Sequence, residues 1–165
     1  MIVRRLHSED WKILRALRLA ALRTDPTAFA TSFEVSEQMA EAEWQEMLAT
    51  RNYFAAFDGD DPIGLIALRP DDGESFLHRG VVLNVYVAER ARGQGVGSIL
   101  LEAIADHAKT LGILQLELGV SAVSEGAIRL YEKNGYEKIG TMPRGFRVGG
   151  KFYDEIYMIR FLDRA

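Results

Sequence analysis

The residues best suited to bind a ligand form a glycine-rich turn in mid-chain, Arg92-Gly93-Gln94-Gly95-Val96-Gly97. An apolar segment typical of a strand, residues 81–87, precedes the turn, and residues 98–105 continue from it with the apolar spacing of a helix. The first N–H groups of a helix have no intrahelical partner, and the helix dipole adds partial positive charge there. Glycines let the backbone approach a phosphate closely because no Cβ intervenes. The turn therefore predicts a phosphate or pyrophosphate site at residues 92–98.

Two common phosphate-binding turns do not fit this spacing. The ATP-binding loop needs Gly-Lys followed by Ser or Thr, but Gly150-Lys151 is followed by Phe152. The dinucleotide fingerprint needs a third glycine or alanine, where this chain has Ser98 or Leu100. Glu117 does lie about twenty residues further on, where a ribose-binding acid is expected. The missing third glycine therefore disfavours a dinucleotide.

A third pattern, Arg/Gln-x-x-Gly-x-Gly/Ala, is matched in full by Arg92, Gly95 and Gly97. From these six residues alone, a tight turn without a ligand remains an alternative. A second segment matches Ala-x-x-Leu-Tyr-x-x-x-Gly-Phe/Tyr, namely Ala127-Ile128-Arg129-Leu130-Tyr131-Glu132-Lys133-Asn134-Gly135-Tyr136, and a late Tyr153-Asp154 precedes Met158. In their order and separation these motifs resemble those of the GNAT family of N-acetyltransferases. The resemblance covers the chain from residue 81 to its end, and more loosely the whole chain.

The resemblance implies where acetyl-CoA, the co-substrate, binds. Its pantetheine arm would run beside the long strand at Val85, Tyr86 and Val87, whose backbone would hold the thioester carbonyl. The neighbouring strand, residues 114–120, would splay away to make room. The pyrophosphate would bind the turn, at Arg92, Gly93, Gln94, Gly95, Val96, Gly97 and Ser98. Ser124 stands where the family commonly has Asn, so its contact with the cofactor is expected to have a shorter reach, while its side chain could cap the following helix.

Tyr131 matches the family position that donates a proton to the departing sulfur. An unperturbed phenol with a pKa of about 10 suits a thiolate of similar basicity. The alternative is a core tyrosine on an amphipathic helix. The candidates for the general base are Glu34, Asn84, Tyr86 and Glu117.

Residues 26–34 are similar to the acceptor-site loop of several small-molecule members of the family. Glu34 could accept the amine proton there, or it could be a solvated surface acid. Phe29 and Phe33 could wall the acceptor pocket or pack a helix onto the sheet. Asn84 and Asp154 are further candidates for acceptor binding.

Composition limits the classes of function. The 165 residues, 48% of them hydrophobic, fit a single domain with one core, residues 1–165, which the resemblance implies is an N-acetyltransferase domain. The net charge of −4 gives no general basic surface for nucleic acid and slightly favours cationic acceptors. Without Cys there is no thiol nucleophile, which closes a Cys-based acyl-enzyme route and leaves direct transfer to an acceptor open. The absence of Cys also fits the cytosol, and a cytoplasmic location is expected. The histidines lack metal-ligand spacing and no apolar run could span a membrane, so we expect neither metal nor membrane.

Apolar periodicity predicts an α/β fold with a mixed central sheet flanked by helices, in the order β-α-α-β-β-β-α-β-α-β-β. This is the order that the GNAT resemblance implies. Helices are expected at residues 9–23, 37–50, 98–111 and 124–133, and residues 27–36 as a loop. Strands are expected at residues 2–6, 53–57, 63–68, 76–87, 114–120, 136–142 and 152–161, with a bulge at Gly80.

We therefore expect an acyltransferase that moves acetyl from acetyl-CoA to a primary amine of a small molecule, an amino acid or a polyamine-like amine. One alternative acceptor is a protein N-terminus or lysine. Another alternative is a non-catalytic CoA-binding module, which would have no need of the acid Tyr131. A homodimer is expected by family analogy, through the strand edge around residues 145–153.

Overall fold

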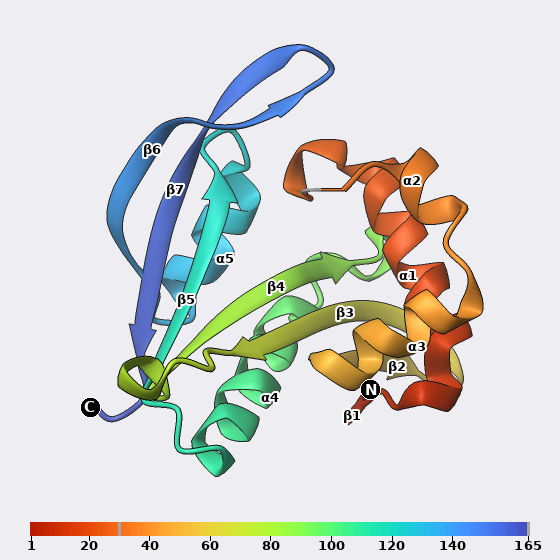
Figure 1. Ribbon diagram of the computed structural model, residues 1–165, viewed down its shortest axis with the longest axis horizontal. Helices are drawn as coiled ribbons and strands as arrows, with labels where there is room; N and C mark the ends of the chain where they lie inside the picture. The colour runs from red at the N-terminus through yellow and green to blue at the C-terminus, as the bar shows by residue number, and fades with distance from the viewer. Residues whose placement is uncertain (30, 165) are drawn as a thin grey trace.

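The computed structural model describes residues 1–29 and 31–164, which form one seven-stranded sheet with helices on both faces (Figure 1). In chain order the main elements are β1 (Ile2–Arg5), α1 (Trp11–Thr24), α2 (Phe33–Glu37), α3 (Glu41–Thr50), β2 (Asn52–Asp58), β3 (Asp61–Pro70), β4 (Arg79–Val87), α4 (Val96–Thr110), β5 (Gln115–Ser121), α5 (Glu125–Lys133), β6 (Glu137–Val148) and β7 (Lys151–Phe161). Short 3-10 turns lie at Ser8–Asp10, Pro26–Ala28, Glu74–Phe76 and Glu89–Ala91. The predicted α/β class and mixed sheet are confirmed.

The strands lie in the order β1-β2-β3-β4-β5-β7-β6, so the sheet order departs from the chain order only at its last two strands. Every neighbouring pair is antiparallel except β4 and β5, which run parallel. The helix α4 makes the crossover between these two parallel strands, as a parallel connection requires. The β4–β5 pair is therefore the junction between two antiparallel parts of the sheet.

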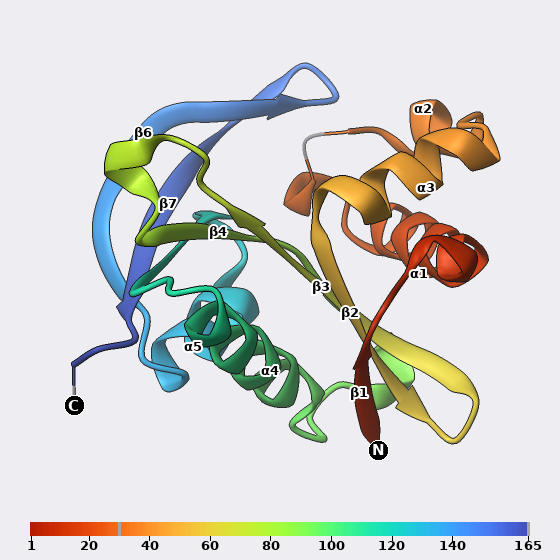
Figure 2. The same ribbon diagram turned by 60° about the horizontal axis from the view of Figure 1, so that its bottom comes forward.

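Alternating residues of the central strands pack into two separate hydrophobic cores, one on each face of the sheet. Tyr53, Ala55 and Phe57 of β2 pack with α1 and α3, whereas Ala56 of the same strand packs with α4 on the other face. This alternation follows from the two-residue period of a strand. Figure 2 shows α1, α2 and α3 on one side of the sheet and α4 and α5 on the other. The sheet is thus buried on both faces along its centre, which holds the site elements in fixed positions.

The long central strand differs from its prediction in two ways. It begins at Arg79 and not at Phe76, because residues 74–76 form a 3-10 turn. The predicted bulge at Gly80 is wrong, since Gly80 pairs regularly with Pro70 and Leu116. The irregularity lies instead near Asn84, which has a φ of 56°. A bulge redirects side chains locally, so β4 is bent where the resemblance places the reaction.

The segment between α1 and β2 also differs from its prediction. Residues 33–36, expected as loop, form with Glu37 the short helix α2, where the Ser32 hydroxyl accepts a hydrogen bond from the Val35 N–H at 3.3 Å. The following helix begins at Glu41 and not at residue 37. There the Glu43 carboxylate accepts a hydrogen bond from the Ala40 N–H at 2.7 Å. The two caps therefore begin two separate helices, α2 and α3, where the sequence predicts one loop followed by one helix.

Candidate active site

The strands β4 and β5 separate after their first three paired residues. The pairs are Arg79 with Gln115, Gly80 with Leu116 and Val81 with Glu117. Beyond them, β4 continues to Val87 and β5 continues to Ser121, and Figure 1 shows the two ribbons diverging. The expected splay is therefore present. It leaves one edge of β4, at residues 82–87, without a partner strand, and such an edge can pair with an extended ligand.

The glycine turn lies at the open end of this splay. Gly93 and Gly95 have φ values of 76° and 82°, a left-handed region that favours glycine. Helix α4 begins at Val96, and no side chain caps its first turn. A Cβ placed on Gly93 or Gly95 would meet no protein atom within 4 Å. The turn thus presents free N–H groups beside open space, which fits a pyrophosphate.

The polar side chains of the turn fold back onto its backbone. The Arg92 Nε donates a hydrogen bond to the Val87 carbonyl at 3.2 Å, and the Gln94 Nε2 donates one to the Arg90 carbonyl at 3.0 Å. Arg90 itself pairs with the Asp61 carboxylate at 2.5 Å. These contacts fix the end of β4 against the start of α4. In this arrangement Arg92 and Gln94 shape the loop, and the backbone N–H groups are left as candidate anion donors.

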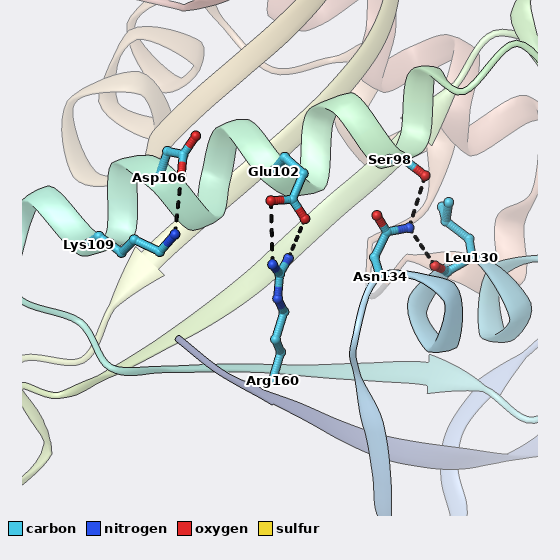
Figure 3. A network of polar contacts seen from close by, with 7 residues as sticks. All are labelled: Ser98, Glu102, Asp106, Lys109, Leu130, Asn134 and Arg160. Atoms are coloured by element: carbon cyan, nitrogen blue, oxygen red, sulfur yellow. Dashed lines mark hydrogen bonds and ion pairs between the residues drawn. The ribbon is translucent and has the colours of Figure 1, made fainter. Parts of the chain in front are cut away.

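The last glycine of the motif serves helix packing. A Cβ on Gly97 would lie 2.7 Å from the Leu130 Cδ2, so the missing side chain lets α4 approach α5. Figure 3 shows the polar contacts that accompany this approach. The Asn134 amide donates to the Ser98 hydroxyl at 3.0 Å and to the Leu130 carbonyl at 2.8 Å, and Arg160 of β7 pairs with Glu102 of α4 at 2.7 Å. Ser98, predicted as a cofactor contact, therefore also joins the two helices.

Tyr131 lies on α5 with only 7% of its surface exposed. Its ring packs edge-on against Tyr136, with the centroids 5.8 Å apart. Burial raises the pKa of the Tyr131 hydroxyl above its ordinary value, because the phenolate would lose its hydration. The hydroxyl therefore keeps its proton, but it is a weaker acid than the unperturbed phenol assumed from the sequence.

Ser124 does not cap α5 through its side chain, contrary to expectation. Among the described residues, only its backbone forms hydrogen bonds here. The Ser124 N–H donates to the Ser121 carbonyl at 2.9 Å, and the Ser124 carbonyl accepts from the Ile128 N–H at 3.0 Å. The side chain is thus not used by the helix.

A cavity of about 540 Å³ lies between the α1–α2 segment and the turn that joins β6 to β7. Phe29, Phe33 and Glu34, the three predicted acceptor residues of the loop, all line it. Arg23 and Arg147 line it as well, and the Arg23 guanidinium lies 4.4 Å from the centroid of the Phe33 ring. Residue 30 of the predicted loop lies outside the described residues. The structure therefore brings the predicted loop residues together around one hollow, which carries two arginines beside one acid.

The other predicted acceptor residues lie elsewhere. Asn84, at the bend of β4, hydrogen-bonds to Tyr53 and Arg18. Asp154 is exposed and does not line the cavity. Its carboxylate accepts a hydrogen bond from the Arg144 N–H at 2.9 Å, where Arg144 has a φ of 52°. Asp154 thus stabilises a kink in β6.

Glu117, one candidate for the general base, is held in an ion pair. Its carboxylate accepts two hydrogen bonds from the Arg79 guanidinium, one of them at 2.8 Å from Nη2. The hydrogen bonds from Arg79 lower the pKa of Glu117 below its ordinary value. A carboxylate already paired in this way is poorly suited to accept a proton from an amine.

Comparison with known proteins identifies the family. The profile of the acetyltransferase (GNAT) family matches residues 16–136, about three quarters of the chain. This chain belongs to the GNAT family. An L-methionine sulfoximine/L-methionine sulfone acetyltransferase of Pseudomonas paraeruginosa is 31% identical over 96 residues, which are 58% of this chain and 54% of that protein. The chain thus spans about half the length of this curated relative.

Solved GNAT structures share the whole fold. A GNAT acetyltransferase from Streptococcus pneumoniae has a TM-score of 0.85 at 24% identity and covers 97% of this chain, which covers 98% of it. YncA from Salmonella typhimurium, solved with its cofactor acetyl-CoA, has a TM-score of 0.80 at 18% identity, over 100% of this chain and 95% of YncA. At these identities the likeness is one of fold.

Within this GNAT fold, sequence reasoning missed three arginines, Arg18, Arg23 and Arg147. Arg18 could have been recognised from the sequence, because it lies on the apolar face of α1 with Leu14 and Ala21, where a charged residue is unusual. Arg147 gave no such signal, because the end of β6 reaches the cavity only through the tertiary fold.

Two further observations concern the part of the chain that the structure describes. It contains no group of three or more His, Cys, Asp or Glu residues that could hold a metal ion. None of its helices is long and apolar enough to cross a membrane.

Proposed function

We propose that this GNAT protein is an N-acetyltransferase that moves the acetyl group of acetyl-CoA directly to a primary amine of a small molecule, an amino acid or a polyamine-like amine. One observation carries the proposal. The chain combines a splayed β4 edge that leads to a glycine turn with a partly open cavity of about 540 Å³ lined by Phe29, Phe33 and Glu34. The first feature suits an extended acyl carrier with a pyrophosphate, and the second suits a small acceptor.

The geometry supports the cofactor contacts that the resemblance implies. The free edge of β4, at Val85, Tyr86 and Val87, would pair with the pantetheine amides. The turn at residues 92–98 would bind the pyrophosphate through its backbone N–H groups. The Ser124 side chain, which α5 does not use for capping, could contact the same ligand.

Acetyl-CoA, when bound, supplies the acetyl group as a thioester. A bond forms between the neutral amine nitrogen and the acetyl carbon, the carbon–sulfur bond breaks, one proton leaves the nitrogen and one proton joins the sulfur. Tyr131 is proposed to donate the proton to sulfur, since burial keeps its hydroxyl protonated. Glu34, on the cavity wall, is proposed to accept the amine proton, directly or through water.

The competing acceptor is a protein N-terminus or lysine, which would need an open groove. The cavity, lined by the 3-10 turn at residues 26–28, the start of α2 and the end of β6, is partly open to solvent, and its modest volume of about 540 Å³ favours a small molecule. The non-catalytic alternative remains less favoured because it gives no role to Tyr131.

A homodimer is proposed as well. β6 is an edge strand of the sheet, and its Ile139 and Met142 are 63% and 49% exposed. Such a strand offers backbone and apolar surface to a second copy, and a monomer in light scattering at micromolar concentration would contradict this. The cytoplasmic location stays a prediction from the sequence.

The decisive experiment measures CoA thiol release from acetyl-CoA with a panel of amino acids, polyamines and N-terminal peptides. Thiol release that depends on a small primary amine, with the N-acetyl product seen by mass spectrometry, is the expected result. Faster turnover of peptides would favour the protein-directed alternative. Binding of acetyl-CoA without transfer to any acceptor would favour the non-catalytic module.

A further inference from the structure

Arg18 is a buried cation beside the candidate acceptor site. It lies on the inner face of α1, and only 7% of its surface is exposed. Its neighbours on the same face, Leu14 and Ala21, belong to the apolar core. Burial lowers the pKa of its guanidinium from the ordinary value, which reflects the cost of removing the charge from water. An arginine nevertheless stays protonated in proteins, so the charge must be compensated.

The partners of Arg18 in the described residues are all neutral. One Nη donates to the Asn84 side-chain oxygen, the other donates to the Thr31 hydroxyl at 2.7 Å, and the guanidinium lies 5.1 Å from the centroid of the Phe29 ring. No carboxylate of the described residues forms an ion pair with it. Buried charges in proteins are ordinarily paired. The guanidinium therefore lacks a counter-ion among the residues that the structure describes.

The neutral partners connect Arg18 to the cavity and to the bend of β4. Phe29 and Thr31 both line the cavity, whose walls also carry Arg23 and Arg147 against the single acid Glu34. Asn84 is the residue of β4 that precedes Val85, where the cofactor edge begins, and its amide donates to the Tyr53 hydroxyl at 2.9 Å. Arg18 itself does not line the cavity, but an acceptor there would meet two of its neutral partners, Phe29 and Thr31, together with the positive charge of Arg23 and Arg147.

We propose that Arg18 binds a carboxylate of the acceptor, and that the acceptor is therefore an α-amino acid or a close analogue and not a polyamine. This inference rests on the proposed function and specifies its substrate class. In an α-amino acid the amine and the carboxylate share one carbon, so a carboxylate at Arg18 places the amine beside Asn84 and the bend of β4. The carboxylate would supply the missing counter-ion, in the bidentate geometry that a guanidinium favours.

The test compares each L-amino acid with its own carboxamide, which keeps the amine and side chain but removes the negative charge. For the wild-type protein, kcat/KM should be higher for the acid form than for the carboxamide. In Arg18→Gln, kcat/KM for the acid should fall by about 10²–10³-fold, the usual loss when one partner of a buried charge pair is removed. The carboxamide should change only a few-fold. Arg15→Gln is the matched control, since Arg15 lies on the same helix but donates to the Glu37 carbonyl, and it should keep the wild-type preference.

Two further measurements keep the outcomes distinct. Arg18→Lys retains the charge and should restore part of the preference, and it replaces Arg18→Gln if circular dichroism shows that variant to be unfolded. Calorimetric titration of the CoA complex with each acid and carboxamide reports binding even where turnover is absent. Wild-type preference for carboxamides or polyamines, or equal losses for both forms in Arg18→Gln, would overturn the role of Arg18 while leaving acetyl transfer intact. Absence of transfer to every amine would instead overturn the proposed function, and selective binding of the acid forms would still support the carboxylate site.

Discussion

In the proposed site, the cofactor side is mostly backbone, from the free edge of β4 and from residues 92–98 at the start of α4, whereas the acceptor side consists of side chains from separate segments. Arg18 comes from α1, Thr31 and Glu34 from the segment that follows, and Arg147 from the end of β6. A backbone site depends on glycine spacing and on the start of a helix, both of which are local in sequence. A side-chain site depends on which distant segments the fold brings together, so it can change without altering the motif.

The largest expected effect tests whether Tyr131 belongs to the chemistry or to the core. Tyr131→Phe removes one hydroxyl and keeps the ring that packs against Tyr136. If the hydroxyl protonates the departing sulfur, kcat should fall by about 10²–10⁴-fold while the Kd for acetyl-CoA changes little. Steady-state kinetics and calorimetry measure the two quantities separately.

Tyr136→Phe is the matched control for Tyr131→Phe. The Tyr136 hydroxyl is buried and has no hydrogen-bond partner among the described residues, so its removal should leave kcat unchanged and protein stability equal or higher. Near wild-type turnover in Tyr131→Phe would assign Tyr131 to the core. Weaker binding of acetyl-CoA at constant kcat would make its hydroxyl a cofactor anchor.

The second prediction distinguishes loss of the proposed pyrophosphate site from backbone strain at a glycine with positive φ. Gly95→Val and Gly59→Val both place a side chain at positive φ, 82° and 57°, with no protein atom within 4 Å of the new Cβ. Both variants should lose stability, by about 1–2 kcal/mol from the left-handed backbone. Only Gly95→Val should weaken CoA binding, by about 10–100-fold, because the side chain occupies the space beside the free N–H groups. Equal CoA affinities in the two variants, measured by calorimetry, would place the pyrophosphate elsewhere.

The smallest effect concerns the paired end of the β4–β5 junction, where the Arg79–Glu117 ion pair lies. Hydrogen bonds from Arg79 lower the pKa of Glu117, so the ionised form of this carboxylate is favoured more in the folded state than in the unfolded chain. The stabilisation is thus present above the unfolded pKa of about 4.3 and is lost as pH falls through the lower folded value. Glu117→Gln should cost up to about 1 kcal/mol at pH 7, a modest value because both side chains are partly exposed. Urea unfolding at pH 7 and pH 3 should show this difference shrinking at acid pH; an unchanged difference would mean that packing, and not charge, sets the effect.

The sequence allowed prediction of the fold class, the element order and the cofactor turn, because glycine spacing and apolar periodicity are local signals. The bulge was misplaced at Gly80 because its position near Asn84 depends on how β4 pairs with β3. Helix α2 was not predicted because its start is marked only by one capping hydroxyl, that of Ser32, within a segment expected as loop. The pairing of Arg18 with Thr31 and Asn84 could not be predicted, since it joins three segments whose contact only the tertiary fold decides.

The three residue pairs between β4 and β5 also affect how a ligand changes the stability of the folded state. They divide the sheet into two parts, each made from a continuous stretch of chain: β1–β4 with α4 before the seam, and β5–β7 with α5 after it. Besides these pairs, Gly97 against Leu130, Ser98 against Asn134 and Glu102 against Arg160 tie the parts together. A ligand along the free edge of β4 would act as an additional strand in this seam. At 100 times its Kd such a ligand adds about 2.7 kcal/mol to folding stability, so the lifetime of the protein in the cell would follow the supply of its acetyl donor.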